Sequence, residues 1–268
     1  MATKKVTVRT LRKIKDAGEK FSMLTAYDYS TAKYFDEAGI DVILIGDSLA
    51  MVALGYENTN SIGVEEMGIF TKAVAKGAKN AMVVTDMPFM SYTIGIPSAL
   101  KNIGDMVKLG ANAVKLEGCN DYMIELIKRT TQMGVPVMGH IGFTPQSQNV
   151  IGGHLIQGKT EEAMEEMLKQ AKRLEEAGVF SIVLEMTPQD CGKYITENIN
   201  VPTISCGAGK YCTGQVMVCD DLLGKFSDFK PKFARKYGDM KSLILDCAKK
   251  YNEDVKNGNY PNEEEIYN

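Results

Sequence analysis

One unit recurs along the chain and limits the folds that it can adopt. A helix-like stretch ends at a glycine, and a short apolar run rich in Val and Ile follows. The glycine suits the residue after a helix, where the backbone is left-handed, and the apolar run suits a parallel strand buried on both faces. In four of these units the run leads to a carboxylate, and these acids are Asp47, Asp86, Glu117 and Glu185.

The spacing of the units predicts a closed barrel. Successive acids are about 31 to 39 positions apart, or about twice that where the run leading to His140 intervenes. Eight such units fill the 268 residues, and strand–helix alternation at this pitch is typical of parallel α/β folds. An open Rossmann-type sheet is the alternative, but no GxGxxG follows any run. We therefore predict a single (β/α)8 TIM barrel with an N-terminal helix, as one catalytic domain over residues 1–268.

The predicted strands and two helices can be placed along the chain. The strands are the apolar runs at 21–26, 40–46, 81–85, 111–116, 134–139, 179–184, 201–205 and 215–219, of which the last is the least regular. A helix over 160–177 carries an apolar stripe of Met164, Met167, Leu168, Ala171 and Leu174. The basic N-terminal segment lacks the apolar region of a secretory signal. We expect a helix there with Val8, Leu11 and Ile14 turned inward; a transit peptide is the alternative, because no acid precedes Asp16.

Composition excludes several classes of protein. The 31 basic residues are balanced by 34 acidic ones, so a nucleic-acid or membrane-surface protein, which needs a basic face, is not expected. No apolar run approaches the ~20 residues of a membrane span. The six cysteines form no CxxC and the chain has two histidines, which excludes zinc-finger spacing. We expect reduced thiols in a cytoplasmic protein.

The carboxyl ends of the strands form one mouth, which carries the active site in such barrels. The charged residues expected there are Asp47, Asp86, Glu117, Glu185, Lys115 and His140. Each acid could instead cap the N-terminus of the next helix, which is common for Asp after a strand. Four acids together, two of them Glu, favour a shared site. Carboxylate oxygens suit a hard divalent cation such as Mg²⁺, which keeps some of its waters.

These residues point to enolate chemistry. Mg²⁺ can polarise a bound carbonyl and stabilise an enolate. Lys115 is two positions before Glu117, so both side chains face the same side of a strand. Lys115 can therefore offset the negative charge of a substrate. Alternatively, Lys115 forms an ion pair buried in the barrel. Glu185 can be the base that removes a proton beside the carbonyl. The residues therefore predict metal-assisted enolisation of a small oxo-acid.

Eight segments, in order along the chain, match one known family. They are Thr25–Ser30 (TAYDYS), Gly46–Leu49 (GDSL), Asp86–Met90 (DMPFM), Val114–Gly118 (VKLEG), Gly139–Ser147 (GHIGFTPQS), Leu184–Glu185, Gly207–Gly209 (GAG) and Pro231–Phe233 (PKF). On these segments, and from about residue 6 to Pro261, the chain resembles the ketopantoate hydroxymethyltransferase (3-methyl-2-oxobutanoate hydroxymethyltransferase) family of the phosphoenolpyruvate/pyruvate barrel superfamily.

The resemblance implies a reaction and residue roles. The reaction is transfer of a hydroxymethyl group from 5,10-methylenetetrahydrofolate to 3-methyl-2-oxobutanoate, which gives 2-dehydropantoate for pantothenate and coenzyme A synthesis. By resemblance, the Mg²⁺ ligands are Asp47, Asp86 and Glu117, the oxo-acid contacts are Asp47, Ser48, Asp86 and Lys115, and the proton acceptor is Glu185. The resemblance also implies a cytoplasmic homo-oligomer, typically a decamer.

Three features of the sequence bear on other functions. The segment Gly153–Thr160 satisfies the P-loop pattern GxxxxGK[ST] of NTPases. However, a P-loop leaves a strand directly, whereas residues 144–152 intervene here. Another Mg²⁺-dependent lyase or mutase of the same superfamily would use the same acids, although the Lys-Lys-Cys-Gly-His loop of the isocitrate-lyase type is absent. A non-catalytic binding barrel is the remaining alternative, and the intact acids argue against it.

Overall fold

The strands close into the predicted barrel. The computed structural model describes residues 5–225 and 231–267. Its strands pair in chain order, all parallel, and the last pairs with the first. They are β1 (Phe21–Thr25), β2 (Val42–Ile45), β3 (Met82–Asp86), β4 (Ala113–Glu117), β5 (Val137–Gly142), β6 (Ser181–Glu185), β7 (Thr203–Cys206) and β8 (Gly214–Met217). The (β/α)8 prediction is confirmed. The eighth strand begins one residue earlier and ends two residues earlier than the predicted run at 215–219.

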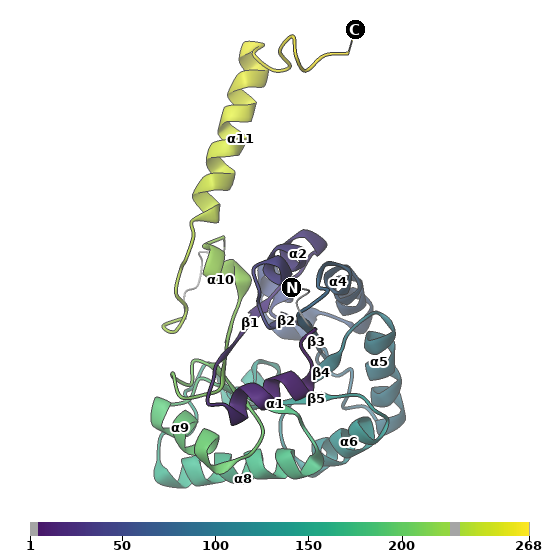
Figure 1. Cartoon of the computed structure of the whole chain (residues 1–268), viewed down its shortest axis with the longest axis vertical. Coiled ribbons are helices and arrows are strands. Elements are labelled where there is room, and N and C mark those ends of the chain that lie inside the picture. Colours follow the sequence, from purple (N-terminus) through teal and green to yellow (C-terminus); the bar gives the residue numbers. More distant parts are fainter. Residues whose placement is uncertain (1–4, 226–230, 268) are drawn as a thin grey trace. The chain divides into compact units, whose positions relative to one another are not determined.

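Helices connect the strands on the outside of the barrel. They are α2 (Tyr29–Glu37), α4 (Val64–Gly77), α5 (Ile96–Lys108), α6 (Asp121–Gln132), α8 (Glu161–Ala177) and α9 (Gln189–Asn198). In Figure 1, α4, α5, α6 and α8 follow one another around the strands. The connections after β2 and β5 are longer and contain the short helical segments α3 (Leu49–Val52), η1 (Thr59–Ser61), η2 (Pro145–Ser147) and α7 (Gln148–Ile151).

Helix α8 shows why the local sequence forms these elements. The Thr160 side chain accepts a hydrogen bond from the Ala163 amide at 3.2 Å, which caps the N-terminus. Gly178, at φ 100°, ends the helix in the left-handed conformation that favours glycine. Most of the predicted stripe is buried, namely Met167, Leu168, Ala171 and Leu174. The helix and its inward face are confirmed.

The N-terminal helix α1 (Val8–Asp16) contributes to the core of the barrel. Leu11 is fully buried in a cluster with the inward residues of the strands, such as Phe21 and Met138. Val8 and Ile14 pack against the same cluster. Because most of these strand residues lie in the first half of their strands, α1 covers the end of the barrel opposite the acids (Figure 1). The predicted inward face of this helix is confirmed.

The chain divides into two compact units, Met1–Val218 and Cys219–Asn268. The first contains the barrel, and the second contains α10 (Cys219–Leu223) and α11 (Met240–Asn257). Helix α11 has no buried residue and exposes the apolar side chains of Leu243, Ile244 and Leu245. The prediction of one domain over 1–268 stays a prediction. Over 5–225 and 231–267, no helix is both long enough and apolar enough to cross a membrane.

Replacing Leu11 with Ala is expected to destabilise the barrel. The change leaves a cavity in the buried cluster, and such Leu→Ala changes cost about 2–5 kcal/mol. Urea unfolding measures the loss. Lys13→Ala, at an exposed position of the same helix, is the control and should change the free energy of unfolding by less than about 0.5 kcal/mol. Equal stability of the two variants would contradict the role of α1 in the core.

Candidate active site

Four strands carry acids at the same rim of the barrel. Asp86, Glu117 and Glu185 are the last residues of β3, β4 and β6, and Asp47 lies just beyond β2. None of them caps the following helix, because the N-cap residues of α3, α5, α6 and α9 are Ser48, Gly95, Asn120 and Pro188. The alternative that these acids cap the following helices is therefore wrong. The fold places the four acids at one mouth of the barrel, as predicted.

The parallel register sets which residues are neighbours. Asp86 on β3 is level with Lys115 on β4, and Glu117 on β4 is level with His140 on β5. Side chains alternate along a strand, so Lys115 and Glu117 share one face. All four side chains are buried. The strands therefore bring two acids and two bases together without any help from loops.

Lys115 lies at the centre of this cluster. Its Nζ is 3.1 Å from Asp86 Oδ1, 3.5 Å from Glu117 Oε1 and 3.2 Å from His140 Nδ1. Only 5% of the residue is exposed. The buried ion pair that the sequence left open is thus present, and contact between Lys115 and a substrate stays a prediction.

His140 connects Glu185 to the cluster. Its Nδ1 lies 3.2 Å from Glu117 Oε1, and its Nε2 lies 3.3 Å from Glu185 Oε2. The second contact has ion-pair distance without hydrogen-bond geometry. The Glu185 side chain is 17% exposed, compared with 3% for Glu117. Glu185 is therefore the acid of this pair that a molecule entering the mouth can reach.

Burial and mutual repulsion shift the ionisation of the cluster. Burial, with the charges of Asp86 and Glu117, raises the pKa of Asp47 to about 8. Burial also raises the pKa of Asp86. For Glu117 burial acts in the same direction, but Lys115 and His140 outweigh it and lower the pKa. Burial and Lys115 oppose the protonation of His140, yet Glu117 and Glu185 raise its pKa to about 9. The cluster holds more carboxylates than its cations balance.

Gln146, to which the sequence assigned no role, links three parts of the site. Its Nε2 donates to Asp47 Oδ2 at 2.9 Å and to the Met87 carbonyl at 3.0 Å. Its backbone N–H donates to Glu117 Oε2 at 3.1 Å, and the Tyr92 hydroxyl donates to its Oε1 at 2.7 Å. The residue lies on η2 after β5. The sequence feature that could have drawn attention to Gln146 is its position within the family motif Gly139–Ser147.

The residues expected to contact an oxo-acid lie together. The backbone N–H of Asp47 donates to Asp86 Oδ2 at 3.0 Å. Ser48 follows Asp47 directly, and its hydroxyl lies 2.9 Å from the hydroxyl of Tyr27. With Lys115 beside Asp86, these side chains form one wall of the mouth. Tyr27 is an addition from the structure, although it lies within the segment Thr25–Ser30.

The acids at the mouth differ in how well they suit Mg²⁺. In the described ranges, no three His, Cys, Asp or Glu side chains are arranged as a ready metal site. Both Glu117 oxygens have protein partners, which are His140 and the Gln146 amide. Asp86 Oδ1 is different, because it is buried without a hydrogen bond although Lys115 lies 3.1 Å away. A site of one or two carboxylates with waters and substrate oxygens is typical of Mg²⁺ and fits Asp86 and Asp47.

The P-loop-like segment does not have P-loop geometry. It follows the short helices η2 and α7 instead of leaving a strand, and Gly152 and Gly153 both have positive φ. The Thr160 hydroxyl caps α8, and the His154 ring lies 5.0 Å from the Phe143 ring. The segment is therefore part of the connection between β5 and α8 and offers no support for an NTPase.

The closed (β/α)8 barrel with an acid-rich mouth defines a class of barrel enzymes. The family model of ketopantoate hydroxymethyltransferase matches residues 5–263. A protein of Caldicellulosiruptor saccharolyticus named 3-methyl-2-oxobutanoate hydroxymethyltransferase is 49% identical over 98% of this chain and 99% of its own length. A Clostridium botulinum protein of the same name is 52% identical over 97% and 95%. The chain belongs to the ketopantoate hydroxymethyltransferase family, as its motifs indicated.

Solved structures agree on the fold. A phosphonopyruvate hydrolase, determined in complex with oxalate and Mg²⁺, has a TM-score of 0.61 and 14% identity, covering 97% of this chain and 93% of its own. A 2,3-dimethylmalate lyase of the PEP mutase/isocitrate lyase superfamily has a TM-score of 0.61 and 12% identity, covering 97% and 91%. At this identity the likeness establishes the barrel fold alone.

Replacing Gln146 with Leu is expected to destabilise the site. The variant leaves Asp47 and the Tyr92 hydroxyl without their partner, and an unsatisfied buried polar group costs about 1–3 kcal/mol. Thermal and urea unfolding measure this loss. Gln148→Leu is the matched control, because Gln148 is the first residue of α7, is only half-buried, and makes no side-chain hydrogen bond to the described residues of the site. If both variants were as stable as the parent protein, the linking role of Gln146 would be wrong.

Proposed function

We propose that this protein transfers a hydroxymethyl group from 5,10-methylenetetrahydrofolate to 3-methyl-2-oxobutanoate, giving 2-dehydropantoate for pantothenate synthesis. The observation that carries the proposal is the near-complete match to relatives of that name at about half identity. The buried cluster of Asp47, Asp86, Glu117 and Lys115 supports it. A lyase or mutase reaction of the superfamily has only the shared fold in its favour.

We propose that Asp47, Asp86 and Glu117 hold one Mg²⁺. The excess of carboxylates in the cluster and the buried Asp86 oxygen without a hydrogen bond support a cation at this place. When bound, the metal supplies a Lewis acid that polarises the oxo group of the substrate. Glu117 already binds Gln146 and His140, so its part can be indirect, through a water ligand.

The side chains of the chain then divide the work on the oxo-acid. Lys115 and Ser48 bind and orient it, and the ammonium charge of Lys115 offsets negative charge that develops on the substrate. Glu185 accepts the proton from C3, which leaves an electron pair on that carbon for the new bond to the one-carbon unit. His140, 3.3 Å from Glu185, positions this carboxylate. Overall, the reaction consumes one water and releases tetrahydrofolate.

We further propose a cytoplasmic homo-oligomer, a decamer by family resemblance. The exposed apolar side chains of α11 support contact with other copies of the chain, because such groups gain free energy when a partner covers them. The proposed substrates are small molecules, and the balanced charge of the chain agrees with this.

Replacing Glu185 with Gln is expected to abolish exchange of the C3 hydrogen of 3-methyl-2-oxobutanoate with deuterium. The amide cannot accept the proton, and loss of a general base costs about 10²–10⁴-fold in rate. Proton NMR follows the exchange, and calorimetry should find Mg²⁺ binding largely intact. Glu176→Gln, at an exposed position of α8, is the control. Full exchange in the Glu185 variant would remove Glu185 as the base.

Replacing Asp86 with Asn is expected to weaken the binding of Mg²⁺. The variant loses a charged oxygen next to Asp47, so the Mg²⁺ concentration for half-maximal turnover should rise about tenfold or more. Turnover with and without EDTA, and calorimetric titration with Mg²⁺, measure this change. Asp246→Asn on the exposed helix α11 should behave like the parent protein. An unchanged Mg²⁺ titration in the Asp86 variant would refute the assigned metal site.

A further inference from the structure

The inner face of the barrel differs between its two sides. Strands β3 to β6 carry the charged cluster of Asp86, Lys115, Glu117, His140 and Glu185. Strands β7, β8, β1 and β2 turn uncharged side chains inward, namely Cys206, Val216, Thr25 and Leu44. Thr25 and Leu44 are level, and a Cβ at Gly46 would lie 3.3 Å from the one and 3.6 Å from the other. One side of the interior therefore suits charged groups and the other suits apolar ones.

Cys206, the last residue of β7, lies where the two sides meet. It is level with Glu185 in the parallel register of β6 and β7, so the two side chains point to the same face. The Cys206 side chain packs against the inner core, to which Ile204 belongs, and it is only half-buried. Its backbone is held in place, because the Met186 N–H donates to the Cys206 carbonyl at 2.9 Å. Cys206 is therefore an inward side chain beside the proposed base.

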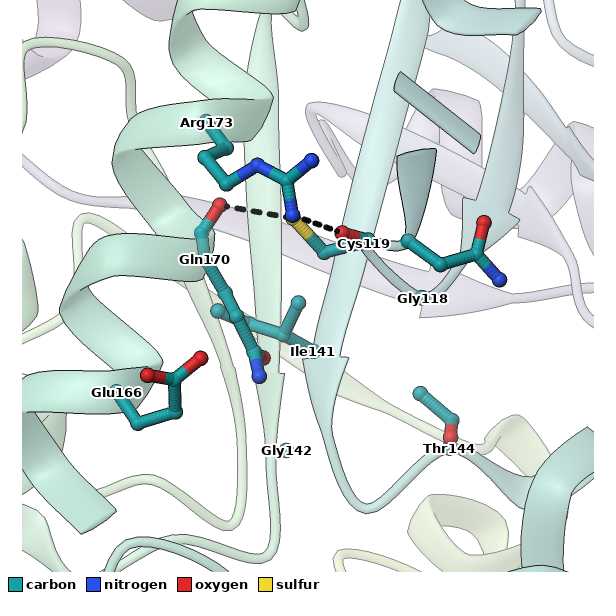
Figure 2. A pocket seen from close by; sticks show the side chains of 9 residues that line it. Gly118, Cys119, Ile141, Gly142, Thr144, Glu166, Gln170 and Arg173 are labelled. Atoms are coloured by element: carbon teal, nitrogen blue, oxygen red, sulfur yellow. Dashed lines mark hydrogen bonds between the residues drawn. The ribbon is translucent and has the colours of Figure 1, made fainter. Parts of the chain in front are cut away.

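The neighbours of Glu185 on β5 differ from Cys206. His140 is polar, and its Nε2 lies 3.3 Å from Glu185 Oε2. Gly142 is level with Glu185 but has no side chain, and a Cβ there would lie 2.3 Å from the Glu185 carbonyl oxygen. Ile141, between them, lies on the other face of the strand and lines a pocket against α8 (Figure 2). Among these neighbours, the apolar side chain on the inner face is that of Cys206.

We propose that Cys206 contacts the alkyl group at C3 of the oxo-acid and limits its size, which rests on the proposed function. A base must lie within hydrogen-bond reach of the proton that it removes, so C3 lies beside the Glu185 carboxylate. The charged oxygens of the substrate go to the side of Lys115, which turns the alkyl group toward the uncharged side. There the thiol of Cys206 acts as a small apolar group, and Val216 continues the same surface.

This contact defines the class of substrates as short 2-oxo acids with small alkyl groups at C3. One methylene more or less in an apolar pocket changes kcat/KM by about 10–200-fold. The side chain at position 206 should therefore decide between oxo-acids that differ by one carbon at C3. A larger side chain there should favour the acid with one methyl group fewer, and a smaller one should favour the acid with one methylene more.

Two variants of opposite size test the proposal. Proton NMR measures kcat/KM for exchange of the C3 hydrogen in 2-oxobutanoate, 3-methyl-2-oxobutanoate and 3-methyl-2-oxopentanoate, with Mg²⁺ and without folate. Cys206→Leu should shift the preference from 3-methyl-2-oxobutanoate toward 2-oxobutanoate about tenfold or more. Cys206→Ala should shift it toward 3-methyl-2-oxopentanoate by a similar factor. Cys247→Ala, which removes an exposed thiol of α11, is the matched control and should keep the parent preference.

The outcomes distinguish this proposal from the proposed function. Opposite shifts in preference support it, because a loss of folded protein lowers the rates with all three acids by the same factor. If the parent protein exchanges the C3 hydrogen and both variants keep its preference, the role of Cys206 is overturned and the proposed function stands. If Cys206→Leu does not fold, an unchanged preference in Cys206→Ala has the same meaning. Absence of both exchange and turnover in the parent protein would instead refute the proposed function.

Discussion

The close packing of three buried carboxylates around one lysine is the interaction on which this site depends. Lys115 contacts Asp86 and Glu117 directly, and Asp47 adjoins them through its backbone hydrogen bond to Asp86. Burial, together with the charges of Asp86 and Glu117, raises the pKa of Asp47 to about 8. Such a cluster costs free energy in folding, because buried charges lose their hydration. The barrel must therefore hold it in place.

The barrel does so through strand geometry. Successive side chains of a strand point alternately to the inside and to the outside of the barrel. The end of one strand can therefore contribute to the inner cluster and to the packing against the outer helices. On β5, His140 faces the cluster and contacts Glu117, whereas Ile141 faces the other side of the strand and lines a pocket together with Glu166 and Gln170 of α8. At the opposite end, Leu11 of α1 adds to the apolar core that holds the strands in register.

The acids could be predicted because they follow recognisable strands. An apolar run and the residue after it are local properties of a sequence, and parallel strands place their carboxyl ends at one rim. Gln146 could not be found in this way. It lies in a connection without a periodic pattern, and its contact with Asp47 joins residues 99 positions apart. The segment Gly153–Thr160 shows the opposite case, in which a local match misleads. Its residues satisfy the P-loop pattern, but it follows the short helices η2 and α7, whereas a P-loop directly follows a strand.

The sequence by itself determined the order of the strands, the acids at their ends and the membership of the family. These depend on periodicity, on the composition of short runs and on motifs, which are all present in the chain before it folds. Only the tertiary structure decided that Lys115 is shared between Asp86 and Glu117 and that Gln146 links Asp47 to Glu117. Such contacts depend on the register between strands and on closure of the barrel, which bring together residues far apart in the chain.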